Sequence, residues 1–101
     1  MLLLMNIDIS DSLRHFFGRY SEERRLPLYR ALVEELVNIH QQTALVDNDE
    51  KLNALKHQLK GICRYLSLAL DEQINMMATL GQLHCLTDNI YGQVAAIEDE
   101  L

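Results

Sequence analysis

One histidine in this sequence is followed at helical spacing by a lysine and a glycine. His57, Lys60 and Gly61 lie within the segment LNALKHQLKGICRYLSLAL, residues 52–70. In a helix, residues three and four positions apart are surface neighbours, so these three would share one face. A neutral imidazole is a nucleophile, and a nearby cation stabilises negative charge on a phosphoryl group during transfer. The segment therefore predicts a phosphate acceptor.

The hydrophobic pattern of the same segment indicates that the histidine faces water. At about 100° per residue, the apolar side of the helix is centred near Leu66, and His57 lies about 180° away from it. Gly61 lies beside His57 on the exposed side, where glycine costs about 1 kcal/mol relative to alanine. Because no core contact explains that cost, we interpret the glycine as open space that lets another protein close over the ring.

Three cations follow each other at intervals of four along one flank of the histidine. We call Lys56, Lys60 and Arg64 the basic ridge. Such a ridge is unexpected on an acidic protein, and it could meet the negative charge of a phosphoryl group. The alternative is ordinary ion pairing with Glu34 or Glu35 of the preceding helix, which is common and weak at exposed positions.

The segment HQLKG, with His57, Lys60 and Gly61 followed by Leu66 and Ser67, resembles the signature H-x-x-K-G of histidine phosphotransfer (HPt) domains. The order of the predicted helices also resembles these domains, from residue 13 to the C-terminus. The resemblance implies a carrier that accepts a phosphoryl group from an aspartate of one receiver domain and passes it to another. It further implies no kinase activity and no cofactor of its own, because the Mg²⁺ and the aspartates belong to the partner.

The resemblance also implies a role for each residue of the motif. His57 would carry the phosphoryl group on Nε2, Lys60 would steady its oxygens, and Gly61 would leave clearance for the receiver. We expect Lys56 and Tyr65 at the partner interface. From the helical wheel we also expect Arg64, of the basic ridge, to help Lys60 bind the phosphoryl group. The family has a small residue before the histidine and several after the glycine, whereas this chain has Lys56 before it and Ile62, Cys63, Arg64 and Tyr65 after it. Ser67 stands where the family commonly has a glycine. These departures predict either a restricted set of receivers or a protein that docks without transferring.

The composition favours an all-α protein, and wide apolar stripes with short connections predict an antiparallel four-helix bundle with a short additional N-terminal helix, in a single domain over residues 1–101. Of these residues 49% are apolar, one is proline and four are glycine. A chain of this length suffices for one core. An alternative is a helical pair that completes its core by dimerising.

Apolar spacing and capping residues give the expected bounds of the helices. Pro27 is placed in a first turn, where its missing N–H is tolerated. Gly81 is interpreted as the residue that ends a helix. The first expected helix begins at Ser10 or Asp11, and the second begins near Pro27. The third follows a cap at Asp47 or Asn48 and ends near Ser67 or Leu68. The fourth covers residues 71–80, and the last begins before Leu83 and has an apolar stripe that continues to Leu101.

The net charge and the cysteines restrict the expected binding partners and cellular compartment of the protein. A formal net charge of -6 disfavours nucleic acid and acidic membranes as partners. The opening MLLLMN is too short for a signal peptide or a membrane span, and Met5 is an alternative start. Cys63 and Cys85 lack CxxC spacing, so we expect a reducing cytoplasm rather than a disulfide.

Few other features of the sequence suggest chemistry. It contains no GxGxxG, P-loop, GxSxG or HExxH pattern, so an independent enzyme is not expected. Among the other histidines, only His84 is followed three or four positions later by a possible metal ligand, Asp88, and we expect no metal site. Two alternative functions remain: a helical adaptor or inhibitor that docks on a kinase or response regulator without being phosphorylated, and a dimeric scaffold that buries His57. We expect a monomer.

Overall fold

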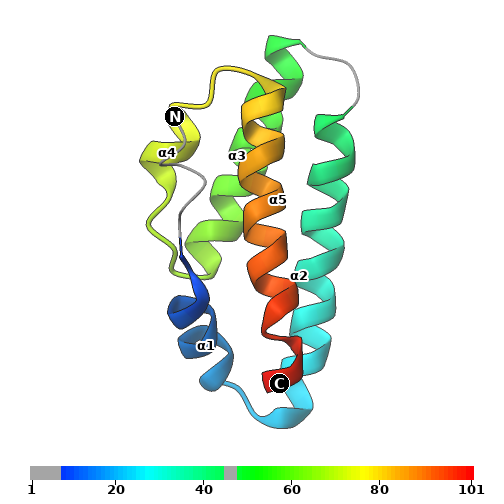
Figure 1. Cartoon of the computed structure of the whole chain (residues 1–101), viewed down its shortest axis with the longest axis vertical. Coiled ribbons are helices and arrows are strands. Elements are labelled where there is room, and N and C mark those ends of the chain that lie inside the picture. The colour runs from blue at the N-terminus through cyan, green and yellow to red at the C-terminus, as the bar shows by residue number, and fades with distance from the viewer. Residues whose placement is uncertain (1–7, 45–47) are drawn as a thin grey trace.

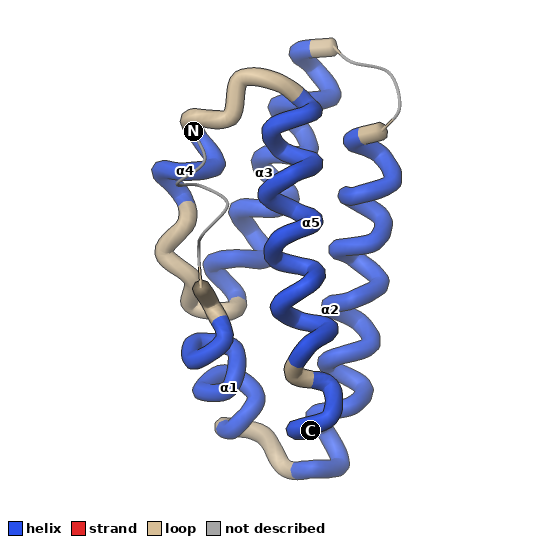
Figure 2. Tube along the Cα trace, in the orientation of Figure 1, coloured by secondary structure: helices blue, strands red, loops and turns tan. Residues whose placement is uncertain are grey.

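The computed structural model describes residues 8–44 and 48–101, and this part of the chain is helical and contains no strand (Figure 2). The all-α expectation is therefore confirmed for these residues. None of the described helices has the length and apolar character needed to cross a membrane. The elements are α1 (Ser10–Gly18), α2 (Glu22–Thr43), α3 (Asp49–Tyr65), α4 (Asp71–Asn75), α5 (Leu80–Ala96) and a final 3-10 turn (Glu98–Glu100).

Three long helices extend along the long axis of the molecule, which measures 41 Å by 24 Å by 19 Å (Figure 1). α2 runs in the opposite direction to α3 and α5, and its most extensive contacts are with α5. The short helices α1 and α4 lie along one side of the long helices, α1 near one end and α4 nearer the other. α4 contacts α3, and α1 contacts α5.

All five α-helices contribute to one apolar core. Burying a leucine or isoleucine side chain contributes about 1.5–3 kcal/mol, so these stripes dominate the packing. Within the described residues, the helices of a single chain form this core among themselves. Of the expected inward positions, Tyr20, Leu28 and Leu101 are partly buried, and the buried ones include Leu13, Phe16, Phe17, Leu32, Leu36, Ile39, Leu52, Leu55, Leu59, Ile62, Leu66, Leu83, Leu86, Ile90, Val94 and Ile97.

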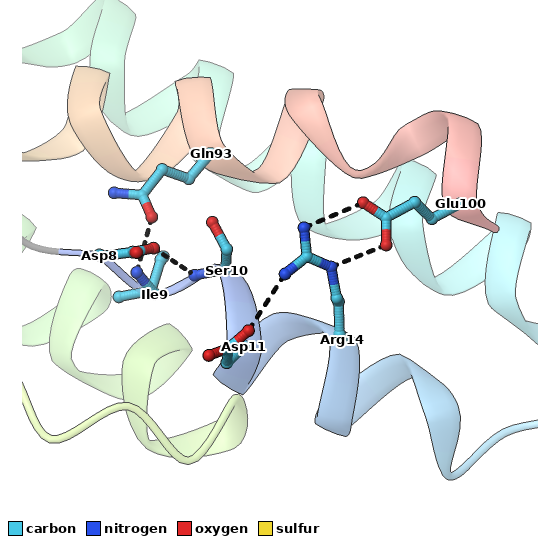
Figure 3. A network of polar contacts seen from close by, with 7 residues as sticks. All are labelled: Asp8, Ile9, Ser10, Asp11, Arg14, Gln93 and Glu100. Atoms are coloured by element: carbon cyan, nitrogen blue, oxygen red, sulfur yellow. Dashed lines mark hydrogen bonds and ion pairs between the residues drawn. The ribbon is translucent and has the colours of Figure 1, made fainter.

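Polar contacts fix the direction in which α1 lies against α5 and the C-terminus (Figure 3). The backbone N–H of Ile9 donates to Oε1 of Gln93 at 2.6 Å, and the guanidinium of Arg14 donates to both carboxylate oxygens of Glu100 at 2.7 and 3.2 Å. The hydrogen bond from Arg14 lowers the pKa of Glu100 below its ordinary value. Since exposed ion pairs stabilise little, the buried phenylalanines of α1 hold the helix and the polar contacts orient it.

The expectation that the second helix begins near Pro27 is wrong, because α2 begins five residues earlier, at Glu22. Ser21 has an extended backbone, and its carbonyl accepts the N–H groups of Arg24 and Arg25 at 3.0 and 3.1 Å, which starts the helix. Two acidic residues in the first turn favour this start through the helix dipole. Pro27 therefore lies inside the helix, beyond the first four positions, and removes one internal hydrogen bond.

The expected helix over residues 71–80, ended by Gly81, is also wrong. α4 covers only the first five of these residues, and Gly81 lies in the first turn of α5. The hydroxyl of Thr79 accepts the N–H of Gln82 at 3.1 Å, and Oε1 of Gln82 accepts the N–H of Ala78 at 2.7 Å. This arrangement is close to a capping box, whose T-x-x-Q spacing was the signal in the sequence that a new helix begins here.

The start of α3 is as expected from the sequence. Asn48 has an extended backbone, and its Oδ1 accepts the N–H of Lys51 at 2.8 Å. A cap of this kind stabilises a helix by about 1 kcal/mol relative to alanine. The other expected cap, Asp47, lies outside the described residues.

α3 ends at Tyr65, earlier than expected, in a turn with left-handed backbone at Ser67, where φ is 62°. The N–H of Ser67 donates to the carbonyl of Arg64 at 3.0 Å, and the N–H of Leu68 donates to the carbonyl of Cys63 at 2.8 Å. This pair of bonds forms a Schellman motif, in which glycine usually takes the left-handed position. A side chain there costs about 1 kcal/mol, so Ser67 occupies a glycine conformation.

Replacing Ser67 by glycine is expected to stabilise the protein. We expect Ser67→Gly to raise the free energy of unfolding by roughly 0.5–1 kcal/mol, because the backbone strain is removed. Urea unfolding followed by circular dichroism measures the change. Ser67→Ala is the control, since it also removes the hydroxyl but keeps the strained backbone, and a glycine variant no more stable than this control would contradict the assignment.

Candidate functional site

α3 holds His57 in solvent, as the helical wheel predicts. Leu55, Leu59 and Ile62 of the same helix are buried in the core, and His57 is exposed on the opposite side. α3 carries this histidine near its middle, away from the fraying ends. The ring is therefore presented on a rigid element and is accessible to another macromolecule.

The helical neighbours of His57 leave space around the ring. Gly61 follows it by four positions, and a Cβ built on this glycine would meet no atom within 4 Å. No packing contact explains the glycine, which agrees with its interpretation as open space. Asn53 and Ala54, four and three positions before the histidine, are short and exposed. The sequence analysis missed these two residues, although the same spacing rule would have found them.

Two cations of the basic ridge are bonded to α4 and the residues after it. Nζ of Lys60 donates to Oδ1 of Asn75 at 2.8 Å. Nζ of Lys56 donates to the carbonyl oxygens of Asn75 and Met77 at 3.0 and 2.9 Å. Lys56 is expected from the sequence at a partner interface, but its ammonium is bonded within the chain. The partners of these two lysines thus lie in and after α4 rather than among the glutamates of α2.

The third cation of the basic ridge, Arg64, forms an ion pair with Asp71 at the start of α4. Its Nε and Nη2 lie 3.0 and 2.7 Å from Oδ2 of the carboxylate. The two side chains are 62% and 41% exposed, so the pair stabilises the fold little, but it neutralises the guanidinium. Lys60 is better suited to meet a phosphoryl group, because its partner is neutral and takes one of its three N–H donors.

An apolar groove of about 460 Å³ lies on the other flank of the histidine, between α1, α2 and α3. Gly61 and Tyr65 line it from α3, Leu28 and Ala31 from α2, and Phe16 from α1. Tyr65 is 59% exposed and its ring lies 5.3 Å from that of Phe16. The groove could not be found from the sequence, since its lining comes from three separate helices. His57 therefore stands between a polar flank toward α4 and an apolar flank toward α2.

A pair of histidines other than His57, one from α2 and one from α5, lies where these two helices pack together. The rings of His40 and His84 stack with centroids 4.0 Å apart. The spacing in the sequence suggested that Asp88 lies next to His84. In the structure, Oδ1 of Asp88 lies 3.3 Å from Nε2 of His40 instead. Nδ1 of His84 lies 2.7 Å from the hydroxyl of Thr43. Within residues 8–44 and 48–101, no group of three or more potential ligands is arranged to hold a metal ion.

Comparison of the chain with known proteins identified no relative. No family model matches the sequence, and no significant match was found among curated proteins or among solved structures. The interpretation of the site therefore depends on its own residues and their geometry.

The open space at Gly61 predicts that this glycine can be replaced without loss of stability. We expect Gly61→Ala to raise the free energy of unfolding by about 1 kcal/mol, because alanine is the better helix former and its methyl group meets no neighbour. Gly92→Ala is a matched control inside α5, where the same space is open. Chemical denaturation of both variants measures the effect, and a destabilised Gly61→Ala protein would show that the glycine has a packing role.

Proposed function

We propose that this protein is a histidine phosphotransfer protein of a two-component phosphorelay. In this proposal His57 accepts a phosphoryl group from an aspartate of one receiver domain and passes it to the aspartate of another. The observation that carries the proposal is an exposed imidazole in the middle of α3, with Lys60 three positions on and unfilled space at Gly61. The protein would act in the cytoplasm as a carrier, without kinase activity or a cofactor of its own.

The order and placement of the helices support this proposal. A short helix α1 precedes two long helices joined near one end, and α4 and α5 follow. In an HPt-like bundle, α4 and the residues around it would take the place of the fourth helix, shortened here to five residues. Ser67 has left-handed backbone at a position where the family commonly has glycine, so the local conformation agrees with the resemblance although the residue departs from it.

The transfer step is a displacement at phosphorus. The Nε2 lone pair of neutral His57 forms the N–P bond while the bond between phosphorus and the aspartyl oxygen breaks, and the receiver carboxylate leaves with the electron pair. The imidazole keeps its Nδ1 proton, so the product is a phosphorylated imidazolium whose positive charge balances the new anion. The ammonium of Lys60 stabilises the charge on the phosphoryl oxygens as they move. The reverse reaction on a second receiver regenerates neutral His57.

The receiver would dock on the exposed face of α3 and on the apolar groove beside it. Gly61 lines the groove and has no side chain, so a partner can approach α3 closely at this position. Tyr65, exposed at the groove, offers a large apolar contact of the kind enriched at interfaces. The same bulky residue favours the second candidate function, an adaptor that docks on a kinase or response regulator without being phosphorylated.

Phosphorylation of His57 is tested by incubating the purified protein with a phosphorylated receiver and Mg²⁺. We expect label that is lost in acid and stable in alkali, as a phosphoramidate bond requires, and complete loss of label in His57→Gln. His15→Gln is the matched control, because His15 is also exposed on a helix but is followed by Gly18 and Arg19 rather than by a lysine at the third position and a glycine at the fourth. Label that persists in His57→Gln would refute the assignment, and binding of the receiver without label would favour the adaptor.

The clearance at Gly61 predicts a second effect on transfer. We expect Gly61→Ala to slow transfer from the receiver by about tenfold or more, because a methyl group displaces the reacting atoms by a fraction of their bonding distance. Gly92→Ala should transfer at the wild-type rate. Rapid-quench measurements with both variants provide the comparison, and equal rates in all three proteins would remove the docking role of the glycine.

A further inference from the structure

We infer that Asn75 is a positioning residue for the phosphoryl group, because it binds the ammonium of Lys60, three positions after His57 on α3, and is itself held in place by Lys56. This inference rests on the proposed function and adds to it a residue outside the sequence motif. It follows from contacts between α3 and α4 that the spacing along α3 does not reveal.

The first contact joins Lys60 to Asn75. Nζ of Lys60 lies 2.8 Å from Oδ1 of Asn75, the last residue of α4. A free lysine side chain samples many rotamers, and a bound partner restricts it to a few. The bond therefore confines the ammonium to the flank of α3 that faces α4, before any phosphoryl group arrives.

An amide is a suitable partner for a lysine that must also meet a phosphoryl group. Asn75 is neutral and takes one N–H, so the ammonium keeps its full charge and two further donors for phosphoryl oxygens. Arg64 gives the contrast on the same ridge, because its partner Asp71 is a carboxylate that neutralises it. The two contacts differ in chemistry although both join α3 to α4.

The second contact fixes Asn75 itself. The last carbonyl groups of a helix have no donor within the helix, and α4 is only five residues long. Nζ of Lys56 supplies donors to the carbonyl oxygens of Asn75 and Met77, at 3.0 and 2.9 Å. The flanking side chains of Ile74 and Met77 are buried in the core. The backbone of Asn75 is thus held from both sides, which leaves its side chain to orient Lys60.

The inference predicts slower phosphorylation of His57 in Asn75→Ala, whichever donor is used. We expect the rate to fall about three- to tenfold, less than the roughly hundredfold fall expected when the charge itself is removed in Lys60→Met. Two donors are compared: a phosphorylated receiver and phosphoramidate, a small donor that needs no docking surface. The fall should be the same for both donors, and the dissociation constant for the receiver should not change.

Two controls separate positioning from a general loosening of α4. Asp71→Asn removes the ion pair between Arg64 and α4 but leaves Lys60 and Asn75 paired, so its rate should stay within about twofold of wild type. In the Lys60→Met background, Asn75→Ala should cause no further fall, because residues that act through one another are not additive. Circular dichroism and thermal unfolding confirm that each variant is folded.

The outcomes distinguish this inference from the proposed function. A folded wild-type protein that takes no label on His57 from either donor would overturn both. Label on wild-type His57 at a rate that Asn75→Ala leaves unchanged would overturn the inference alone. Equal falls in Asn75→Ala and Asp71→Asn, or an additive fall in the Lys60→Met background, would show a structural contact and would also overturn it.

Discussion

The site depends on the burial of one face of α3. Leu55, Leu59 and Ile62 can lie in the core in only one rotational setting of the helix, and that setting turns His57 into water. Because each buried side chain contributes about 1.5–3 kcal/mol, no surface contact of the histidine could rotate the helix against them. The exposure of the ring is therefore a consequence of the core, and the accessibility that the proposed transfer would need is maintained by the burial of these side chains.

The polar flank of α3 depends on a much weaker element. α4 is too short to be stable alone, so it is held by the burial of Ile74 and by hydrogen bonds from the basic ridge. The ridge thus has a structural role that its charge does not indicate. Lys56 and Arg64 are largely committed to it, whereas Lys60 keeps free donors because its partner is an amide. Lys60 is therefore the cation of the ridge that can bind a phosphoryl group, whereas Lys56 and Arg64 mainly hold α4 against α3.

Two positions in and after α3 carry conformational costs, for different reasons. Gly61 lowers helix propensity by about 1 kcal/mol, and a side chain there would meet no neighbour, so the described structure does not require a glycine, which supports its proposed role as clearance for a partner. Ser67 has left-handed backbone that ends α3 and redirects the chain toward α4, so its cost is required by the fold. The conformational cost at Ser67 is therefore explained by the fold, whereas the cost at Gly61 is not, and a cost of this second kind is expected at functional sites.

The sequence by itself determined the faces of the helices and the exposure of His57, and it restricted the cap of α3 to Asp47 or Asn48, because helical periodicity and capping depend on residues a few positions apart. Only the tertiary structure decided which partners the basic ridge has and where the apolar groove lies, because these join side chains from different helices. It also decided the early start of α2 despite Pro27. The boundary at Thr79 falls between these cases, because its capping signal was local but competed with a glycine that indicated the opposite. The spacing within α3 places the imidazole, the lysine and the glycine on one face, whereas contacts between elements decide which partners the cations of the basic ridge have.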